Sequence, residues 1–214
     1  MPFDYGLGMK TALIALVVFL APVTTRASDL NVAVRDTAGK PVRDAVISVY
    51  PSAGLPSGPI RFPWPYVMAQ QNIKFDPAVL VVPVGAEVAF PNRDKVRHHV
   101  YSFSPKNKFE LKLYGREAAP NVAFRTVGAA AIGCNIHDAM VAFVRVVDTP
   151  YALKTDANGG ASIRGLPGGA ARVVIWHPSL KAAKNEMTIQ AAVPANGSVA
   201  LSSAIELRGA TIPR

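Results

Sequence analysis

This chain of 214 residues has one cysteine, so it cannot form a disulfide within itself. It also lacks any long segment whose apolar residues recur with the 3.6-residue period of an amphipathic helix. Yet 50% of its residues are hydrophobic, which is enough for one large or two small domains with cores of their own. These absences exclude a disulfide scaffold and a helical bundle, and they favour β-structure.

Motifs that mark common active sites are missing as well. The chain has no Gly-x-Ser-x-Gly nucleophile turn, no His-Glu-x-x-His zinc motif and no glycine-rich phosphate loop. Its net charge is +9, but the basic residues are scattered singly and no aromatic platform lies among them, which disfavours nucleic acid as a partner. We therefore expect a protein that is not an enzyme and that is attracted to an acidic docking face or an anionic surface.

The N-terminal segment has the layout of a secretory signal peptide. A lysine precedes an apolar run from Thr11 to Pro22, and Thr25 and Ala27 are the small residues that precede a cleavage site. The run is too short to span a bilayer comfortably, although an uncleaved anchor is the alternative. The sequence thus predicts a signal peptide over residues 1–27, and a periplasmic protein with no transmembrane span after cleavage.

Beyond residue 27, short apolar runs alternate with turns rich in glycine, proline and aspartate, which is typical of antiparallel β-structure. Residues 58–66 contain several prolines, which remove backbone donors and fix φ, so this stretch is predicted to be a linker. The runs on either side predict an all-β fold of the sandwich or barrel type.

The two flanks of the chain share a pattern of turns. Val34–Val46 reads Val-x-Asp-x-x-Gly-Lys-Pro-Val-x-x-Ala-Val, and Thr155–Gly169 contains Thr-Asp-x-x-Gly and Gly-Leu-Pro-x-Gly. Together they resemble the carboxypeptidase regulatory-like, or transthyretin-like, β-sandwich family. About a hundred residues separate the two pieces, which indicates a second domain inserted at an exposed turn; two independent hairpins are the alternative. The expected boundaries are 28–57 and 149–208 for the sandwich, 67–148 for the inserted domain, and 209–214 for a tail.

The lone cysteine lies in the stretch Gly-Cys-Asn-Ile-His-Asp-Ala-Met, as Cys134-x-x-His137-x-x-Met140. A free thiol in an oxidising compartment is a liability unless it is buried, modified or bonded to a metal. A thiolate, two imidazoles and a weak axial thioether are the donors of a blue-copper site, so one more histidine must come from a distant strand. His98 and His99 are placed for this at a strand start, whereas a buried thiol with unremarkable neighbours is the alternative.

The region from Tyr66 to Val147 resembles the cupredoxins, in particular the amicyanin and plastocyanin branch. It is also similar to exported proteins labelled methylamine utilization proteins. The resemblance rests on Phe-Pro-Asn-Arg-Asp after an apolar strand pair, a histidine before Val100, Phe-Arg-Thr-Val-Gly at Phe124–Gly128, and the compact Cys-x-x-His-x-x-Met spacing. It implies a Greek-key cupredoxin β-sandwich, inserted into or joined to the regulatory-like sandwich, and one type 1 copper site.

The family pattern, carried over residue by residue, makes His98, Cys134 and His137 the equatorial ligands and Met140 the axial one. His99 stands where the family usually has an asparagine that ties the ligand loops together, and it remains an alternative ligand. In its place Asn135 can supply a loop-to-loop bond to His99, with an effect on ligand geometry and redox potential.

Other residues have plainer interpretations. Asp138 is expected to be a solvated loop charge, because a carboxylate matches a soft copper site poorly, and His177 a strand-end histidine. Four aromatic residues are expected in the core: Tyr101, Phe103, Phe109 and Tyr114.

The resemblance implies a periplasmic electron carrier that serves a redox partner enzyme, with electrons passing through the exposed edge of His137. A copper-handling or assembly accessory protein and a non-catalytic interaction module are the alternatives.

Overall fold

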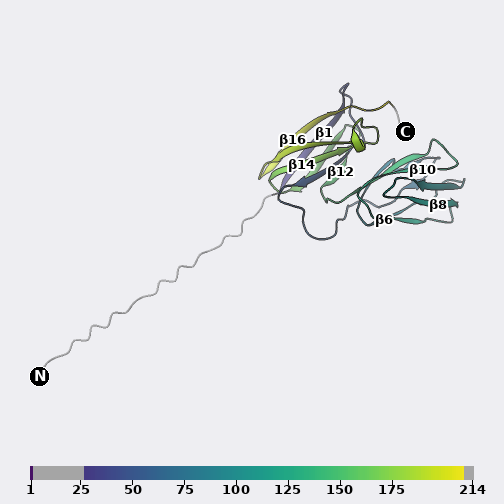
Figure 1. The fold of residues 1–214 in the computed structure, drawn as a ribbon, viewed down its shortest axis with the longest axis horizontal. Helices are drawn as coiled ribbons and strands as arrows, with labels where there is room; N and C mark the ends of the chain where they lie inside the picture. Colours follow the sequence, from purple (N-terminus) through teal and green to yellow (C-terminus); the bar gives the residue numbers. More distant parts are fainter. Residues whose placement is uncertain (2–26, 210–214) are drawn as a thin grey trace.

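The computed structural model of the protein describes residue 1 and residues 27–209. The predicted signal peptide, apart from Met1 and Ala27, lies outside the described residues, as does most of the predicted tail. Regular structure in 27–209 consists of β-strands and one short 3-10 helix, η1 (Ala183–Asn185), so the predicted all-β class is confirmed (Figure 1). Within this range, no helix is long and apolar enough to cross a membrane.

The strands follow one another along the chain in this order: β1 (Ser28–Asp36), β2 (Val46–Pro51), β3 (Ala69–Gln70), β4 (Phe75–Asp76), β5 (Val79–Pro83), β6 (Ala86–Ala89), β7 (His98–Ser102), β8 (Phe109–Tyr114), β9 (Asn121–Phe124), β10 (Gly128–Cys134), β11 (Val141–Val147), β12 (Ala152–Lys154), β13 (Gly160–Leu166), β14 (Gly169–Trp176), β15 (Glu186–Val193) and β16 (Gly197–Ile205).

Strands from the two ends of the chain pair with one another. One sheet has the order β13-β1-β16 and a second has the order β12-β2-β14-β15; we call these the flanking sheets. β1 runs parallel to β16 from the pair Ser28–Gly197 to the pair Asp36–Ile205. Side chains alternate in burial along β1, as expected for a strand with one face against a core. The flanking core buries Leu30, Ile47, Leu166, Val173 and Ile175 among others.

The middle of the chain forms a five-stranded sheet with the order β5-β11-β10-β7-β8 and two short pairs, β6-β9 and β3-β4; we call these the central sheets. Their central core contains Met68, Phe90, Phe124, Cys134 and Met140 with other apolar residues. Because β7 and β10 are neighbours in this sheet, residues at adjoining ends of the two strands are brought close together. Figure 1 shows these strands in teal, beside the purple and yellow-green strands of the flanking sheets.

A third group of apolar residues joins the central and flanking sheets. It includes Val79 and Val81 from β5, Val46 from β2 and Trp176 from β14. The proline-rich stretch 58–66 has no regular structure, but it packs against this junction. Its Trp64 stacks on Phe62 at 4.7 Å between ring centroids, and the Trp64 indole N–H donates to the Val81 carbonyl at 2.8 Å.

Candidate metal centre

Two neighbouring strands place the first two candidate ligands. His98 begins β7 and Cys134 ends β10, and Cys134 pairs directly with Val100 in the antiparallel ladder. Residues two apart on a strand share a face, as do directly opposite residues, so His98, Val100 and Cys134 project to the same side of the sheet. All three are at most 4% exposed, because that side faces the central core.

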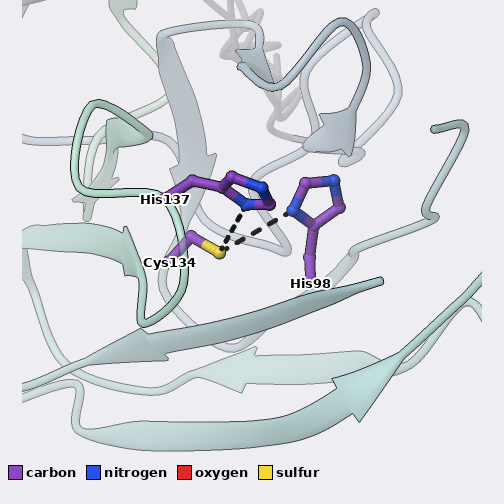
Figure 2. Close-up of side chains that lie close together, drawn as sticks. All are labelled: His98, Cys134 and His137. Carbon is purple, nitrogen blue, oxygen red and sulfur yellow. Dashed lines mark hydrogen bonds between the residues drawn. The ribbon is translucent and has the colours of Figure 1, made fainter. Parts of the chain in front are cut away.

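The side chains of His98, Cys134 and His137 converge, as Figure 2 shows. The Cys134 sulfur lies 3.7 Å from Nδ1 of His98 and 3.7 Å from Nδ1 of His137. One ligand atom from each residue lies within 4.8 Å of the others. The two imidazole rings are 5.0 Å apart between centroids and are tilted by 56°. Three donors from two strands and a loop thus surround one point.

The loop between β10 and β11 carries the remaining candidates. His137 is half-buried, whereas Met140 is 1% exposed and packs in the central core with Cys134. The Met140 N–H donates to the His137 carbonyl at 2.9 Å, which closes the loop into a tight turn. The short spacing therefore lets Cys134 and Met140 lie inside while His137 forms the outer edge.

Asp94 supports His98 from the side opposite to the sulfur. The Nε2–H of His98 donates to the Asp94 carboxylate at 2.9 Å, and Nδ1 is turned toward Cys134. Burial alone would raise the pKa of Asp94, but hydrogen bonds from the Ile73 N–H, His98 and the Asn72 N–H hold that pKa below its usual range. Asp94 therefore stays ionised and fixes the ring.

Asn92 holds the loop that leads to His98. Its side-chain amide donates to the carbonyls of Val96 at 2.8 Å and Tyr114 at 3.2 Å, and its Oδ1 accepts the Asp94 N–H at 2.8 Å. Sequence analysis missed the roles of Asp94 and Asn92. For Asp94, the only signal that the sequence offers is its position four residues before His98.

His99 points away from the three converging residues. Its Nε2 contacts the Glu110 carboxylate of β8 at 2.9 Å, and its side chain is 20% exposed, whereas that of His98 is fully buried. The two ligand loops are tied through the main chain, because the Asn135 N–H donates to the His99 carbonyl at 3.0 Å. The Asn135 side chain is exposed, so the predicted bond between these residues is made by backbone atoms.

The other residues singled out in the sequence lie apart from the site or beside it. Asp138 is exposed. His177 is 7% exposed, and its Nδ1 accepts the Ser179 N–H at 3.2 Å; burial lowers its pKa, partly offset by Asp44 and by a hydrogen bond to the Arg43 backbone.

The expectation that Phe103 is a core residue is wrong, because this side chain is 69% exposed. It follows a strand whose side chains alternate, and its ring packs on Tyr101 at 4.6 Å between centroids. Tyr101, also expected in the core, is only partly buried and lies outside the central core; its ring covers Gly133, next to Cys134. Tyr114 is buried in the central core, and Phe109 packs against that core while partly buried.

The donor set fits a soft first-row metal ion. Bonds of about 2.3 Å to sulfur and about 2.0 Å to nitrogen, at trigonal or tetrahedral angles, place the two donors about 3.5–3.7 Å apart. The 3.7 Å separations agree with this spacing. A thiolate with two imidazoles and a buried thioether matches copper better than zinc, since structural zinc sites use no thioether.

No family model matches the chain, and no curated protein matches it. Several solved structures resemble part of it. A purple cupredoxin from Nitrosopumilus maritimus is 22% identical, with a TM-score of 0.34, over 38% of this chain and 98% of that one. A reduced Cu(I) form of an amicyanin mutant is 25% identical, with a TM-score of 0.35, over 49% of this chain and 99% of that one.

The copper-containing nitrite reductase from Thermus scotoductus SA-01 is 22% identical, with a TM-score of 0.37, over 55% of this chain. This chain spans only 28% of that nitrite reductase. The structural neighbours are thus cupredoxins and a copper-containing reductase, and each likeness is partial.

Proposed function

We propose that this protein holds one copper ion in a type 1 site and carries single electrons to or from a redox partner enzyme. The ligands in this proposal are His98, Cys134, His137 and Met140. One observation supports it above all: the Cys134 sulfur lies 3.7 Å from a ring nitrogen of each histidine, so three donors of the blue-copper set face one point.

Each residue of the site has a separate task. Cys134 supplies the thiolate, and its burial keeps oxidants in the solvent away from the sulfur. Asp94 fixes the tautomer and orientation of His98, and Met140 presents its thioether from the core side. Copper held by these residues would supply one-electron chemistry. His137, half-buried at the rim, is the ligand that a partner protein would approach.

The same donor set argues for a carrier instead of an enzyme. Catalytic metal sites keep one coordination position open for water or substrate. Here His98, Cys134 and His137 converge and Met140 is buried in the same core as Cys134, so the four proposed protein ligands would leave no position open. We therefore propose that the site exchanges electrons and binds no substrate.

The rest of the proposal concerns location and partners. We propose that the chain is exported to the periplasm and that its net charge of +9 favours a partner with an acidic docking face. We also propose that the central sheets form a cupredoxin sandwich, inserted into a regulatory-like sandwich formed by the flanking sheets. Two observations support this arrangement. Strands from the two ends of the chain pair in the same sheets, and each group of sheets has a core of its own.

Voltammetry on the copper-loaded protein tests the function. We expect a reversible wave that corresponds to one electron per chain and that is absent from the Cys134→Ser variant. Copper release to a Cu(I) acceptor without a reversible wave would instead favour the copper-handling role. Failure of the wild-type protein to bind copper would contradict both functions and leave a non-catalytic interaction module.

A further inference from the structure

A cleft of about 950 Å³ lies where the central and flanking sheets meet. Its walls come from both groups of sheets: Lys40 and Asp44 near β1 and β2 on one side, and Phe75 and Val141 of the central sheets on the other. This volume is at the upper end of the range for small-molecule sites, about 300–1,000 Å³. The cleft is not used by the proposed electron carrier site.

Positive charge predominates in the cleft. Five cationic side chains line it, and three carboxylates do, those of Asp36, Asp44 and Asp76. Two of these carboxylates are already engaged. Asp36 accepts the backbone N–H groups of Ala38 and Lys40 at 2.9 and 2.8 Å. Asp44 pairs with Lys154 at 2.8 Å and with Arg43 at 3.5 Å, so these two cations are paired as well. Five cations against three carboxylates leave an excess of two positive charges in the lining. The cations that line the cleft are Lys40, Arg43, Lys74, Lys154 and Arg208.

The arrangement of the lining indicates the shape and chemistry of a ligand. Four of the cations come from three separate segments of the flanking part of the chain, and Lys74 comes from the central part, so they suit an extended anion better than a compact one. The lining also includes apolar residues such as Pro77, Ala78 and Leu207. The two aromatic rings in the lining, Phe75 and His177, are 5% and 7% exposed and offer no platform for a nucleic acid base. Carboxylates alternating with apolar side chains would complement this lining.

We propose that the cleft binds an acidic, partly apolar segment of a partner protein. The inference rests on the proposed function only in naming this partner as the redox partner.

The cleft touches the segment that holds Met140 directly, and it contacts the segment of His98 through Asn72 and Asp94. Ala139 and Val141, on either side of Met140, form part of its wall. So does Asn72, whose N–H donates to the Asp94 carboxylate at 2.6 Å, and Asp94 in turn holds His98. A segment bound in the cleft thereby brings the partner protein against the loops that carry His98 and His137.

Peptide binding to the metal-free protein tests the proposal. The probe is a fluorescein-labelled peptide that alternates glutamate with leucine, measured by fluorescence anisotropy at low and high salt. We expect binding that weakens as salt rises, because exposed charges are screened. The variant Lys40→Glu, Arg43→Glu, Arg208→Glu is expected to bind at least about tenfold more weakly.

A matched variant provides the control for net charge. Lys112→Glu, Arg125→Glu, Arg164→Glu makes the same charge change at exposed positions outside the cleft, and we expect binding within about twofold of wild type. Thermal unfolding of both variants checks that each is folded. Equal losses in the two variants, or no binding by the wild-type protein at low salt, would overturn the proposal.

Competition distinguishes the class of partner. An oligonucleotide or a vesicle of anionic lipid that displaces the peptide more effectively than unlabelled peptide does would overturn an acidic protein segment as the ligand. Since binding is measured without metal, a negative result here leaves the copper proposal standing. Conversely, a protein that binds the peptide but not copper retains the docking cleft and loses the proposed function.

Discussion

His98 and His177 are both buried histidines beside the end of a strand, yet only His98 faces further candidate metal ligands. His98 is held between the Asp94 carboxylate and the Cys134 sulfur. His177, which directly follows β14 of the flanking sheets, accepts the Ser179 N–H and has its pKa lowered by burial. Burial alone therefore does not mark a metal ligand. What distinguishes His98 is that a carboxylate fixes one nitrogen while the other meets further donors.

The largest expected effect is the loss of copper affinity in His98→Ala, compared with His177→Ala as its counterpart. His98→Ala should weaken copper binding by more than about a hundredfold, since loss of a ligand exceeds the 10–100-fold cost typical of losing a supporting group. His177→Ala should leave copper affinity within about twofold of wild type, although it lowers stability by about 1–3 kcal/mol. Competition with a copper-chelating dye measures both affinities. Equal losses of copper affinity in the two variants would contradict the assignment of His98, and not His177, as a copper ligand.

The two cores also contain glycines that differ in what surrounds them. A Cβ on Gly159 would collide with the Val34 carbonyl, and this glycine has φ of +75°, a conformation that other residues rarely adopt. Gly159→Ala should therefore lower the free energy of unfolding, measured with urea, by about 2–4 kcal/mol.

A Cβ on Gly133 would instead lie 2.8 Å from the Tyr101 ring, which can turn away. Gly133→Ala should cost about 1–2 kcal/mol, and most of that cost should vanish in a Tyr101→Ala background. A cost that persists in the double variant would show that the backbone, and not the tyrosine ring, limits this position.

Asp94→Asn tests the carboxylate hydrogen bond that supports the His98 ring and that has no counterpart at His177 among the hydrogen bonds described. An amide can still contact the His98 ring, but it no longer selects the same tautomer, so copper affinity should fall about 10–100-fold. Asp138→Asn, in the exposed part of the ligand loop, should change affinity less than about twofold. Unchanged affinity in Asp94→Asn would contradict the supporting role of this carboxylate.

The smallest effect concerns pH. Because burial lowers the pKa of His177 from 6.5, the unfolded chain binds a proton there before the folded one does. The contribution of His177 to stability is therefore complete above pH 6.5 and is lost as pH falls below this value. The free energy of unfolding, measured with urea on the metal-free proteins, should decline less steeply with falling pH for the His177→Gln variant than for the wild-type protein. A steeper decline in the variant would contradict the direction of the shift.

Much of the fold followed from local pattern. Alternation along β1 and the turns around Gly39 and Gly159 are visible in the sequence, so the all-β class was predicted correctly. The anchoring of residues 58–66 was not predicted, because proline content reveals the loss of regular structure but not the contacts of Trp64. Phe103 was misplaced since an aromatic residue in an alternating run suggests a core position, whereas the structure exposes it.

The candidate ligands were visible in the sequence because three of them lie within seven residues of one another. The choice of His98 over His99 came from the family pattern, and the structure turns His98 toward Cys134 and His99 toward Glu110. The carboxylate behind His98 could not be predicted. Its position depends on the turn at Asn72 and Ile73, whose backbone N–H groups hold Asp94 in place.

The central claim is that Cys134 and the two converging histidines bind copper as a thiolate site, and visible absorption of the Cu(II)-loaded protein tests it most directly. We expect an intense thiolate-to-copper band that is absent from the Cys134→Ser variant. No such band in the wild-type protein, with the thiol still open to alkylation after copper is added, would contradict it.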